Sequence, residues 1–326
     1  MRIVVIGAGA MGGSYGGLLA LAGHEVGLID TWEAHVHAIN REGLHLAGAR
    51  GDHTIPLRAA TGPEGVGPAD AVICFVDSNH TAEAAKTAAA VLAPDGYAIT
   101  FQNGIGNVEA LQAELGRERV LGGSSMCSAA SRGPGQVVLT HLGLTTIGET
   151  DGRASARAQA LVTALTEAGL ESKLAPDIMS TVWTKFALNC AINALCATTG
   201  LRLGELARLA ELDAFQDRVI EEILAVVAAK GITLADPDLR ATVKRHCRRK
   251  FSKPSMLQHV DAGKRTEIDA LNGALVREAH ALGLATPYNE ALVALLKGRE
   301  LHQRRALHEP DLDYTAWEAR VAAGGE

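Results

Sequence analysis

Three glycines near the start of the chain have the spacing of a phosphate-binding loop. Gly7, Gly9 and Gly12 separate a β-branched run at residues 2–6 from small and apolar residues at helical spacing over 11–21. In such a loop the first glycine permits a tight turn, the second lets the backbone approach a pyrophosphate, and the third lets the helix pack on the sheet. The N–H groups that begin the helix also attract phosphate. The pattern predicts a dinucleotide site made by Gly7, Gly9, Ala10, Met11 and Gly12.

An acidic residue follows the second strand of this unit. Asp30 comes directly after the apolar run at 25–29, where a carboxylate can accept hydrogen bonds from the adenosine ribose. The same carboxylate would repel a 2′-phosphate, and no arginine occurs in the following Thr31-Trp32-Glu33. NAD(H) is therefore the expected cofactor, and NADP(H) is less favoured. The alternative interpretation is that Asp30 caps the helix that follows.

A lysine and two asparagines share one face of an otherwise apolar helix. Lys185, Asn189 and Asn193 lie at positions i, i+4 and i+8 of VWTKFALNCAINAL, residues 182–195. A partly buried lysine can give up its proton near neutral pH and act as a general acid. The alternative is a lysine whose stem packs on apolar neighbours while its ammonium reaches water, beside two hydrogen-bonded core amides.

Asn103 is a candidate cofactor-binding and substrate-binding residue in the N-terminal, strand-containing part of the chain. It follows a predicted strand at 97–101, and ligands of doubly wound sheets bind beyond the carboxyl ends of strands. The Asn103-Gly104 dipeptide is also an ordinary turn sequence, so both interpretations stay open.

Three further candidates belong to the second half of the chain. Glu267 and Asp269 fall in a helix predicted over 264–273, where their i, i+2 spacing puts one inward and the other outward. Ser255, directly after Pro254, is a residue type that favours a helix N-cap.

Alternating strands and helices must position the first group of residues. After the initial strand–helix–strand unit, strands are predicted at 71–76, 97–101 and 119–125, and helices at 81–92 and 107–115. This alternation predicts a parallel, doubly wound sheet.

The pattern changes further along the chain. Strands at 136–139 and 144–147 are predicted to form an antiparallel pair after a turn at 133–135. Beyond about Pro176 the period is almost entirely helical, with breaks at Gly200, Gly231, Asp236-Pro237, Pro254, Gly283 and Pro287. We therefore predict an α/β protein with an N-terminal Rossmann-type sheet at 1–176 and a C-terminal all-α domain at 177–326.

Composition narrows the class of protein. The 326 residues are 47% hydrophobic and 21% charged, which is typical of globular domains, and the net charge of -6 argues against nucleic acid as a partner. Apolar runs are too short to span a bilayer, and no signal-peptide pattern precedes the first strand, so a cytoplasmic protein is expected. Five scattered cysteines are expected to be reduced thiols.

Two histidine and basic patterns carry no site. His35 and His37 are too poorly spaced on a helix to converge on a metal, so no metal is expected. The basic run KRHCRRK at 244–250 is interpreted as a solvated helix face.

Taken together, these segments resemble the ketopantoate reductase (2-dehydropantoate 2-reductase) family over nearly the whole chain. The resemblance is carried by GAGAMGGSYGG, QNG, WTKFALNCAINAL, SMLQ and TEIDALNG, at residues 7–17, 102–104, 183–195, 255–258 and 266–273. It implies a Rossmann domain and a helical domain with an active site in the cleft between them, and a role in pantothenate biosynthesis.

The resemblance also implies residue roles. Lys185 would be the general acid, and Glu267 would contact the substrate and organise the closed site. Asn103, Asn189 and Asn193 would line the cleft, and Ser255 would help to hold the substrate carboxylate. The reaction implied is reduction of a 2-oxo acid to a D-(R)-2-hydroxy acid, with ketopantoate to (R)-pantoate as the first expectation.

The chain departs from the family pattern at four positions. Asp30 and Asp77 stand where NADP-dependent members have arginine and lysine, which favours NAD. Leu203 and His259 stand where an asparagine and an aspartate are usual. A D-2-hydroxy acid dehydrogenase acting on another 2-oxo acid therefore stays open, as does a non-catalytic NAD(H)-binding sensor. A small-molecule substrate is the expected partner, and a homodimer is left open.

Overall fold

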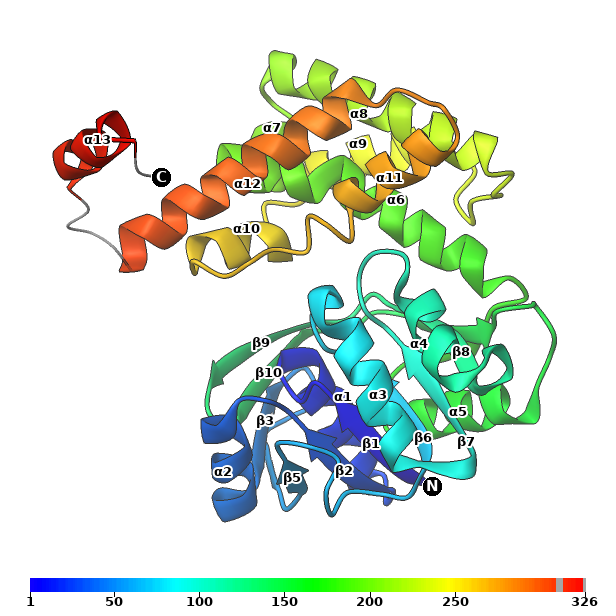
Figure 1. Ribbon diagram of the computed structural model, residues 1–326. Coiled ribbons are helices and arrows are strands. Elements are labelled where there is room, and N and C mark those ends of the chain that lie inside the picture. Colours follow the sequence, from blue (N-terminus) through cyan, green and yellow to red (C-terminus); the bar gives the residue numbers. More distant parts are fainter. Residues whose placement is uncertain (309–312, 325–326) are drawn as a thin grey trace. The chain divides into compact units, whose positions relative to one another are not determined.

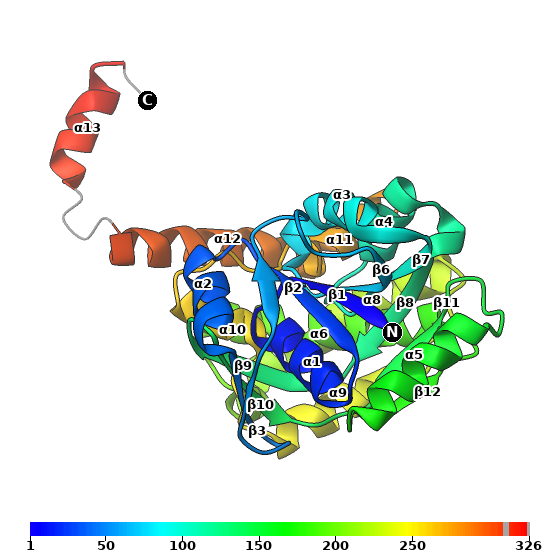
Figure 2. The same ribbon diagram turned by 90° about the horizontal axis from the view of Figure 1, so that it is seen from below.

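The computed structural model describes residues 1–308 and 313–324. Contacts within the chain divide it into two compact units (Figures 1 and 2). Unit 1 comprises Met1–Ala187 and Val227–Pro237, and unit 2 comprises Leu188–Val226 and Asp238–Glu326. Unit 1 is built on two β-sheets, whereas unit 2 is helical.

Within the described residues, an eight-stranded sheet forms the frame of unit 1. Its strands are β1 (Arg2–Ile6), β2 (Glu25–Ile29), β5 (Arg58–Ala60), β6 (Ala69–Cys74), β7 (Leu92–Thr100), β8 (Val120–Ser125), β11 (Thr145–Glu149) and β12 (Ser172–Leu174). They are ordered β12-β11-β8-β7-β6-β1-β2-β5. From β5 to β8 the strands are parallel, and β11 is antiparallel to β8. The strand order reverses beside β1, which is where ligands of doubly wound sheets bind.

Helices cover both faces of this sheet because strand side chains alternate between two cores. Ile3 and Val5 of β1 enter one core with α1 (Ala10–Leu21) and α5 (Ala156–Glu167). Val4 and Ile6 enter the other with α3 (Thr81–Val91) and α4 (Asn107–Leu115). Figure 2 shows these helix pairs on opposite sides of the sheet. The predicted doubly wound sheet is confirmed.

A second, four-stranded sheet lies against α1 and corrects one prediction. Its strands are β3 (Leu44–Gly48), β4 (His53–Ile55), β9 (Ser128–Gly133) and β10 (Gln136–His141), in the order β4-β3-β10-β9. The predicted antiparallel pair of 136–139 with 144–147 is wrong. β10 pairs with β9 and β3, while β11 pairs with β8 and β12. The two strands separate because Val137 packs on the Gly13 side of α1, whereas β11 extends the main sheet.

Unit 2 contains most of the helical half of the chain. Its helices include the second half of α6 (Ile178–Thr199), α7 (Leu203–Leu206), most of α8 (Ala210–Ala229), α9 (Leu239–Arg249), α10 (Ser255–Asp261), α11 (Asn272–Ala281), α12 (Pro287–His308) and α13 (Tyr314–Ala322). The predicted Gly and Pro breaks all fall between helices or at a helix start. Among the described helices, none has the length and apolar character that crossing a membrane requires.

The helix predicted over 264–273 is wrong in its first part. Residues 264–271 form an irregular stretch followed by a turn, and α11 begins only at Asn272. The N–H of Thr266 donates to the carboxylate of Glu300, and the N–H of Ile268 donates to the hydroxyl of Thr266. These side-chain acceptors replace the backbone carbonyls that a helix would use.

The first half of α6 belongs to unit 1 by its contacts. Ile178 packs against Gly122 and Gly148 of the main sheet, where a Cβ at Gly148 would lie 2.9 Å from the Ile178 side chain. The hydroxyl of Thr184 accepts from the N–H of Ala235, which ties residues 227–237 to the same unit. The compact units therefore divide within α6, and the boundary at residue 176 stays a prediction about folding domains.

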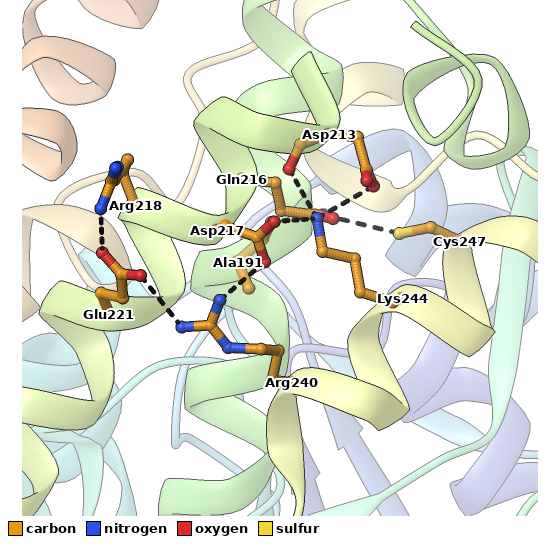
Figure 3. A network of polar contacts seen from close by, with 9 residues as sticks. All are labelled: Ala191, Asp213, Gln216, Asp217, Arg218, Glu221, Arg240, Lys244 and Cys247. Carbon is orange, nitrogen blue, oxygen red and sulfur yellow. Dashed lines mark hydrogen bonds and ion pairs between the residues drawn. The ribbon is translucent and has the colours of Figure 1, made fainter. Parts of the chain in front are cut away.

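The basic run at 244–250 is partly internal (Figure 3). Lys244 is only 13% exposed and forms ion pairs with Asp213 at 2.9 Å and Asp217 at 3.2 Å. Asp217 is shared with Arg240, and Cys247 is buried beside Gln216. The predicted solvated face is right for Arg245 and residues 248–250 and wrong for Lys244, whose charge neutralises the acidic side of α8.

Candidate active site

The glycine loop joins β1 to α1 at the carboxyl edge of the main sheet. Gly7 has a φ of +88°, and a Cβ there would lie 2.5 Å from the backbone nitrogen of Val76. A Cβ at Gly12 would collide with the carbonyl oxygen of Gly7. A Cβ at Gly9, in contrast, would have no atom of a non-neighbouring described residue within 4 Å. The chain itself excludes side chains at Gly7 and Gly12, while the open space beside Gly9 fits the close approach of a pyrophosphate.

The start of α1 is suited to phosphate. Gly9 is its N-cap and supplies no side-chain cap, and the first turn contains no acidic residue. The first-turn N–H groups, including those of Ala10 and Met11, therefore point out of the helix without a capping side chain. The residues present fit the pyrophosphate of a dinucleotide.

The side chain of His35 supports the glycine loop through a hydrogen bond to the backbone of Ala8. This side chain is fully buried in α2 (Glu33–Glu42), with Nε2 2.9 Å from the carbonyl oxygen of Ala8. Nδ1 accepts the N–H of Gly135 at 2.9 Å, so Nε2 carries the hydrogen and donates it to Ala8. One face of the ring stacks on Trp32, with centroids 5.3 Å apart. No local pattern predicts this role, because Gly135 lies 100 residues from His35 along the chain.

Among the described residues, the histidines and cysteines are not grouped into a metal cluster. Within residues 1–308 and 313–324, no three His, Cys, Asp or Glu side chains are grouped to hold a metal ion. His37 is exposed on the opposite side of α2 from the buried His35.

Asp30 lies one strand away from the glycine loop. It follows β2, whose Ile29 is the register partner of Ile6 in β1. One of its carboxylate oxygens accepts the N–H of Trp32 at 2.9 Å, and Trp32 is the N-cap of α2. Asp30 thus fixes the turn into α2 without being the cap itself. Its partly buried carboxylate stands where the ribose of a dinucleotide on this loop is expected.

The loops after β6 and β7 are bound to each other. Asp77 caps the 3-10 turn η1 (Ser78–His80), and the hydroxyl of Ser78 donates to the carbonyl oxygen of Asn103 at 2.6 Å. The side chain of Asn107 donates to the same carbonyl at 2.9 Å. Gly104 then turns the chain with a φ of +89°. Asn103 is therefore both a turn residue and a residue of the carboxyl edge.

Lys185 reaches the same edge from α6. Its Nζ donates to the carbonyl oxygen of Ser125, the last residue of β8, at 2.8 Å. In the order β8-β7-β6-β1-β2, Lys185 and Asp30 lie on opposite sides of the glycine loop. Three strand spacings of about 4.8 Å put the ends of β1 and β8 about 14 Å apart. A dinucleotide with its adenosine at Asp30 would direct its other end toward Lys185.

The remaining candidates belong to unit 2. Asn189 and Asn193 follow Lys185 by one and two turns of α6, the first partly buried and the second 7% exposed. Ser255 is exposed and is the first residue of α10. Its predicted role as N-cap is wrong, because Pro254 occupies that position.

Glu267 and Asp269 divide as predicted between interior and surface. Glu267 is 8% exposed, and its carbonyl oxygen accepts the N–H groups at 270 and 271 in the turn before α11. Asp269 forms ion pairs with Arg265 and Lys297 and is 31% exposed. The structure thus collects the glycine loop, Asp30, Asn103 and Lys185 in unit 1, and Asn189, Asn193, Ser255 and Glu267 in unit 2.

The geometry of unit 1 defines a class of protein. A glycine loop with an open central position, a carboxylate at the next strand end and an ammonium at the same sheet edge are the parts of a Rossmann-type oxidoreductase that uses a nicotinamide dinucleotide.

Similarity to known proteins identifies the family of oxidoreductases to which the chain belongs. The family model described as "Ketopantoate reductase PanE/ApbA" matches residues 3–152, and its C-terminal counterpart matches 177–300. The chain is 32% identical to the 2-dehydropantoate 2-reductase of Archaeoglobus fulgidus over 300 residues, which are 92% of this chain and 98% of the relative. The chain therefore belongs to the ketopantoate reductase family and is an oxidoreductase.

Solved structures agree with this assignment. A PanE/ApbA family ketopantoate reductase from Ralstonia eutropha JMP134 is 34% identical, with a TM-score of 0.87 over 93% of this chain and 100% of that one. D-mandelate dehydrogenase, solved with NADH and anilino(oxo)acetate, is 27% identical, with a TM-score of 0.84 over 93% and 99% of the two chains. The two neighbours share one fold but carry different substrate names.

Proposed function

We propose that this protein uses NADH to reduce a 2-oxo acid to its D-(R)-2-hydroxy acid, with ketopantoate to (R)-pantoate as the reaction. The observation that carries the proposal is the 2.8 Å hydrogen bond that holds the Lys185 ammonium at the carboxyl end of β8. This is the sheet edge that also bears the glycine loop. When a 2-oxo acid is reduced at this edge, its ketone oxygen gains negative charge, and the Lys185 ammonium can protonate that oxygen.

The residues of the chain divide the chemistry among them. When bound, the reduced nicotinamide supplies a hydride, which is two electrons and one proton, to the ketone carbon. The C=O π bond breaks and its electron pair moves onto oxygen. Lys185 stabilises that oxygen and donates the proton that completes the hydroxyl group. In this proposal Ser255 holds the substrate carboxylate, and Glu267, Asn189 and Asn193 orient the rest of the substrate.

Two carboxylates support the preference for NADH. Asp30 stands at the expected ribose position, and its charge would repel a 2′-phosphate. Asp77 caps the turn after β6 and adds a second negative charge at the same edge. No lysine or arginine replaces them in 30–33 or 75–78, where a phosphate would need one.

A dehydrogenase acting on another 2-oxo acid is the second candidate. The similarity to D-mandelate dehydrogenase favours it, because that protein was solved with an aryl oxo-acid analogue, anilino(oxo)acetate. Leu203 is 3% exposed and His259 is partly buried in α10, so both departures from the family pattern are packed into unit 2.

A substrate and cofactor panel separates these candidates. Steady-state kcat/KM is measured for ketopantoate, pyruvate, 2-oxoisovalerate and phenylglyoxylate, each with NADH and with NADPH. The proposal expects the highest kcat/KM for ketopantoate with NADH. A much higher value for phenylglyoxylate would transfer the assignment to the second candidate. Binding of NADH without turnover of any oxo acid would indicate a non-catalytic sensor.

A further inference from the structure

We propose that Tyr15 is a positioning residue for Lys185, because it fixes Ser125, whose carbonyl group holds the lysine ammonium. This inference rests on the proposed function of Lys185 as the general acid. It concerns a residue of α1, which contains the dinucleotide loop at its start. Tyr15 is proposed to act on the lysine through Ser125, whose hydroxyl lies 2.7 Å from that of Tyr15.

The Tyr15 hydroxyl is the centre of a buried hydrogen-bond network. Tyr15 is fully buried, and its oxygen lies 2.7 Å from the hydroxyl of Ser125 and 2.6 Å from that of Thr145. It also donates toward the sulfur of Cys127 at 3.6 Å. Burial raises the pKa of Tyr15 well above its usual value, so the group is a neutral hydroxyl throughout the working range of pH.

Ser125 links this hydrogen-bond network to the orientation of its own carbonyl group. Its side-chain oxygen accepts the N–H of Cys127 at 3.1 Å, and this i to i+2 bond restricts the ψ angle of Ser125. In the peptide group that joins Ser125 to Met126, the N–H of Met126 donates to the carbonyl oxygen of Leu144 at 3.0 Å. The carbonyl oxygen of the same peptide group, that of Ser125, accepts a hydrogen bond from Lys185 Nζ at 2.8 Å. Tyr15 therefore contacts the hydroxyl of Ser125, and the carbonyl group of the same residue accepts the hydrogen bond from Lys185.

Aromatic packing keeps Tyr15 from moving away. Its ring lies 4.8 Å from that of Phe75 and 5.7 Å from that of Phe101, centroid to centroid. These two residues follow β6 and β7 at the sheet edge. Tyr15 is also one helical turn after Met11, in the phosphate-facing first turn of α1. It thus ties the position of the lysine acceptor to the element that binds the cofactor.

Tyr15→Phe tests the proposal, since it removes only the hydroxyl oxygen. Tyr97→Phe is the matched control, because Tyr97 is another buried tyrosine of unit 1 whose hydroxyl donates to the carbonyl of Arg157 at 3.3 Å, away from Lys185. Both variants are measured for thermal stability, NADH dissociation constant, and kcat as a function of pH.

The proposal predicts a split between the two variants. Tyr15→Phe lowers kcat about 10-fold with little change in NADH affinity, because a misaimed catalytic group slows chemistry more than binding. Its alkaline limb of kcat also moves to lower pH, because the carbonyl acceptor favours the protonated form of the lysine. Tyr97→Phe keeps the kcat and pH profile of the wild type. If the two variants lose stability alike and keep the same pH profile, Tyr15 is only a core hydroxyl and the proposal is wrong.

A double-mutant cycle separates this inference from the proposed function. In a Lys185→Met background, Tyr15→Phe is expected to cause no further loss of kcat, because its effect acts through the lysine. A full additional 10-fold loss would overturn the positioning role. If Lys185→Met alone keeps wild-type kcat, the proposed function fails. If Lys185→Met is inactive while Tyr15→Phe matches the wild type, only the positioning role fails.

Discussion

The imidazole of His35 donates a hydrogen bond to the carbonyl oxygen of Ala8 over 2.9 Å, directly behind the glycine loop. The opposite ring nitrogen accepts the N–H of Gly135, in the hairpin that joins β9 to β10. One buried side chain therefore connects the dinucleotide loop of the main sheet to the second sheet. A histidine can do this because it presents one donor and one acceptor on opposite sides of a rigid ring.

His35→Ala is expected to raise the dissociation constant for NADH about 10-fold, which corresponds to about 1.4 kcal/mol. The loop loses its fixed support, and two buried backbone groups lose their partner. Titration of NADH fluorescence measures the effect. His37→Ala is the control, because His37 is exposed on the same helix and should leave the affinity unchanged. Equal affinities for both variants would show that the Ala8 contact does not shape the loop.

Lys185→Ala is expected to lower kcat by about 100-fold or more, the usual scale for loss of a general acid. Steady-state kinetics with saturating NADH and oxo acid measures the change. Lys173→Ala, an exposed lysine of β12, should keep the wild-type rate. An unchanged kcat for Lys185→Ala would remove the lysine from the mechanism.

Asp30→Ala is expected to raise kcat/KM with NADPH relative to NADH, because the variant no longer repels the 2′-phosphate. The ratio of the two efficiencies is the readout, with Asp95→Ala, an exposed aspartate of β7, as the control. A wild-type enzyme that already prefers NADPH would contradict the cofactor argument.

Glu149→Gln is expected to lower the free energy of unfolding by about 2 kcal/mol at pH 7, because it breaks a largely buried pair. Glu149 is 3% exposed and receives two hydrogen bonds from Arg157, at 2.8 and 2.7 Å. Burial raises the pKa of Glu149, but the hydrogen bonds from Arg157 and Ser155 outweigh it, so the net pKa is lowered.

The sign of this pKa shift fixes how the effect depends on pH. A carboxyl group with a lowered folded-state pKa contributes its stability above its unfolded pKa of about 4.3 and loses it as the pH falls through the folded value. The difference between wild type and Glu149→Gln should therefore shrink below about pH 4 in urea denaturation. Glu221→Gln, at an exposed ion pair, should have little effect at any pH. A constant difference from pH 7 to pH 3 would contradict the assignment.

The sequence predicted the parts of the fold that depend on local patterns. The glycine spacing, the alternation of strands and helices and the Gly and Pro breaks are all written within a few residues of the elements that they define. The pairing of β10 and β11 was mispredicted because partner choice depends on packing against α1, which no local pattern records. Likewise, residues 264–271 leave the helix because Glu300, far along the chain, accepts the N–H of Thr266.

The supporting residues of the site were not predictable in the same way. Tyr15 meets Ser125 across 110 residues, and His35 meets Gly135 across 100. Each looks like an ordinary core residue in sequence, and a single aromatic in the glycine-rich stretch at 12–17 was the one signal available for Tyr15. The roles of Asn189, Asn193, Ser255 and Glu267 stay predictions that the resemblance to the family supplies.

The three glycines of the loop also differ in what would happen to them if the protein no longer had to bind a dinucleotide. A Cβ at Gly7 or Gly12 would collide with the chain's own atoms, whereas a Cβ at Gly9 would have no atom of a non-neighbouring described residue within 4 Å. In a library selected for folding alone, position 9 would accept alanine, and positions 7 and 12 would not. The substitutions that Gly9 tolerates therefore report what dinucleotide binding requires at this position, separately from what folding requires.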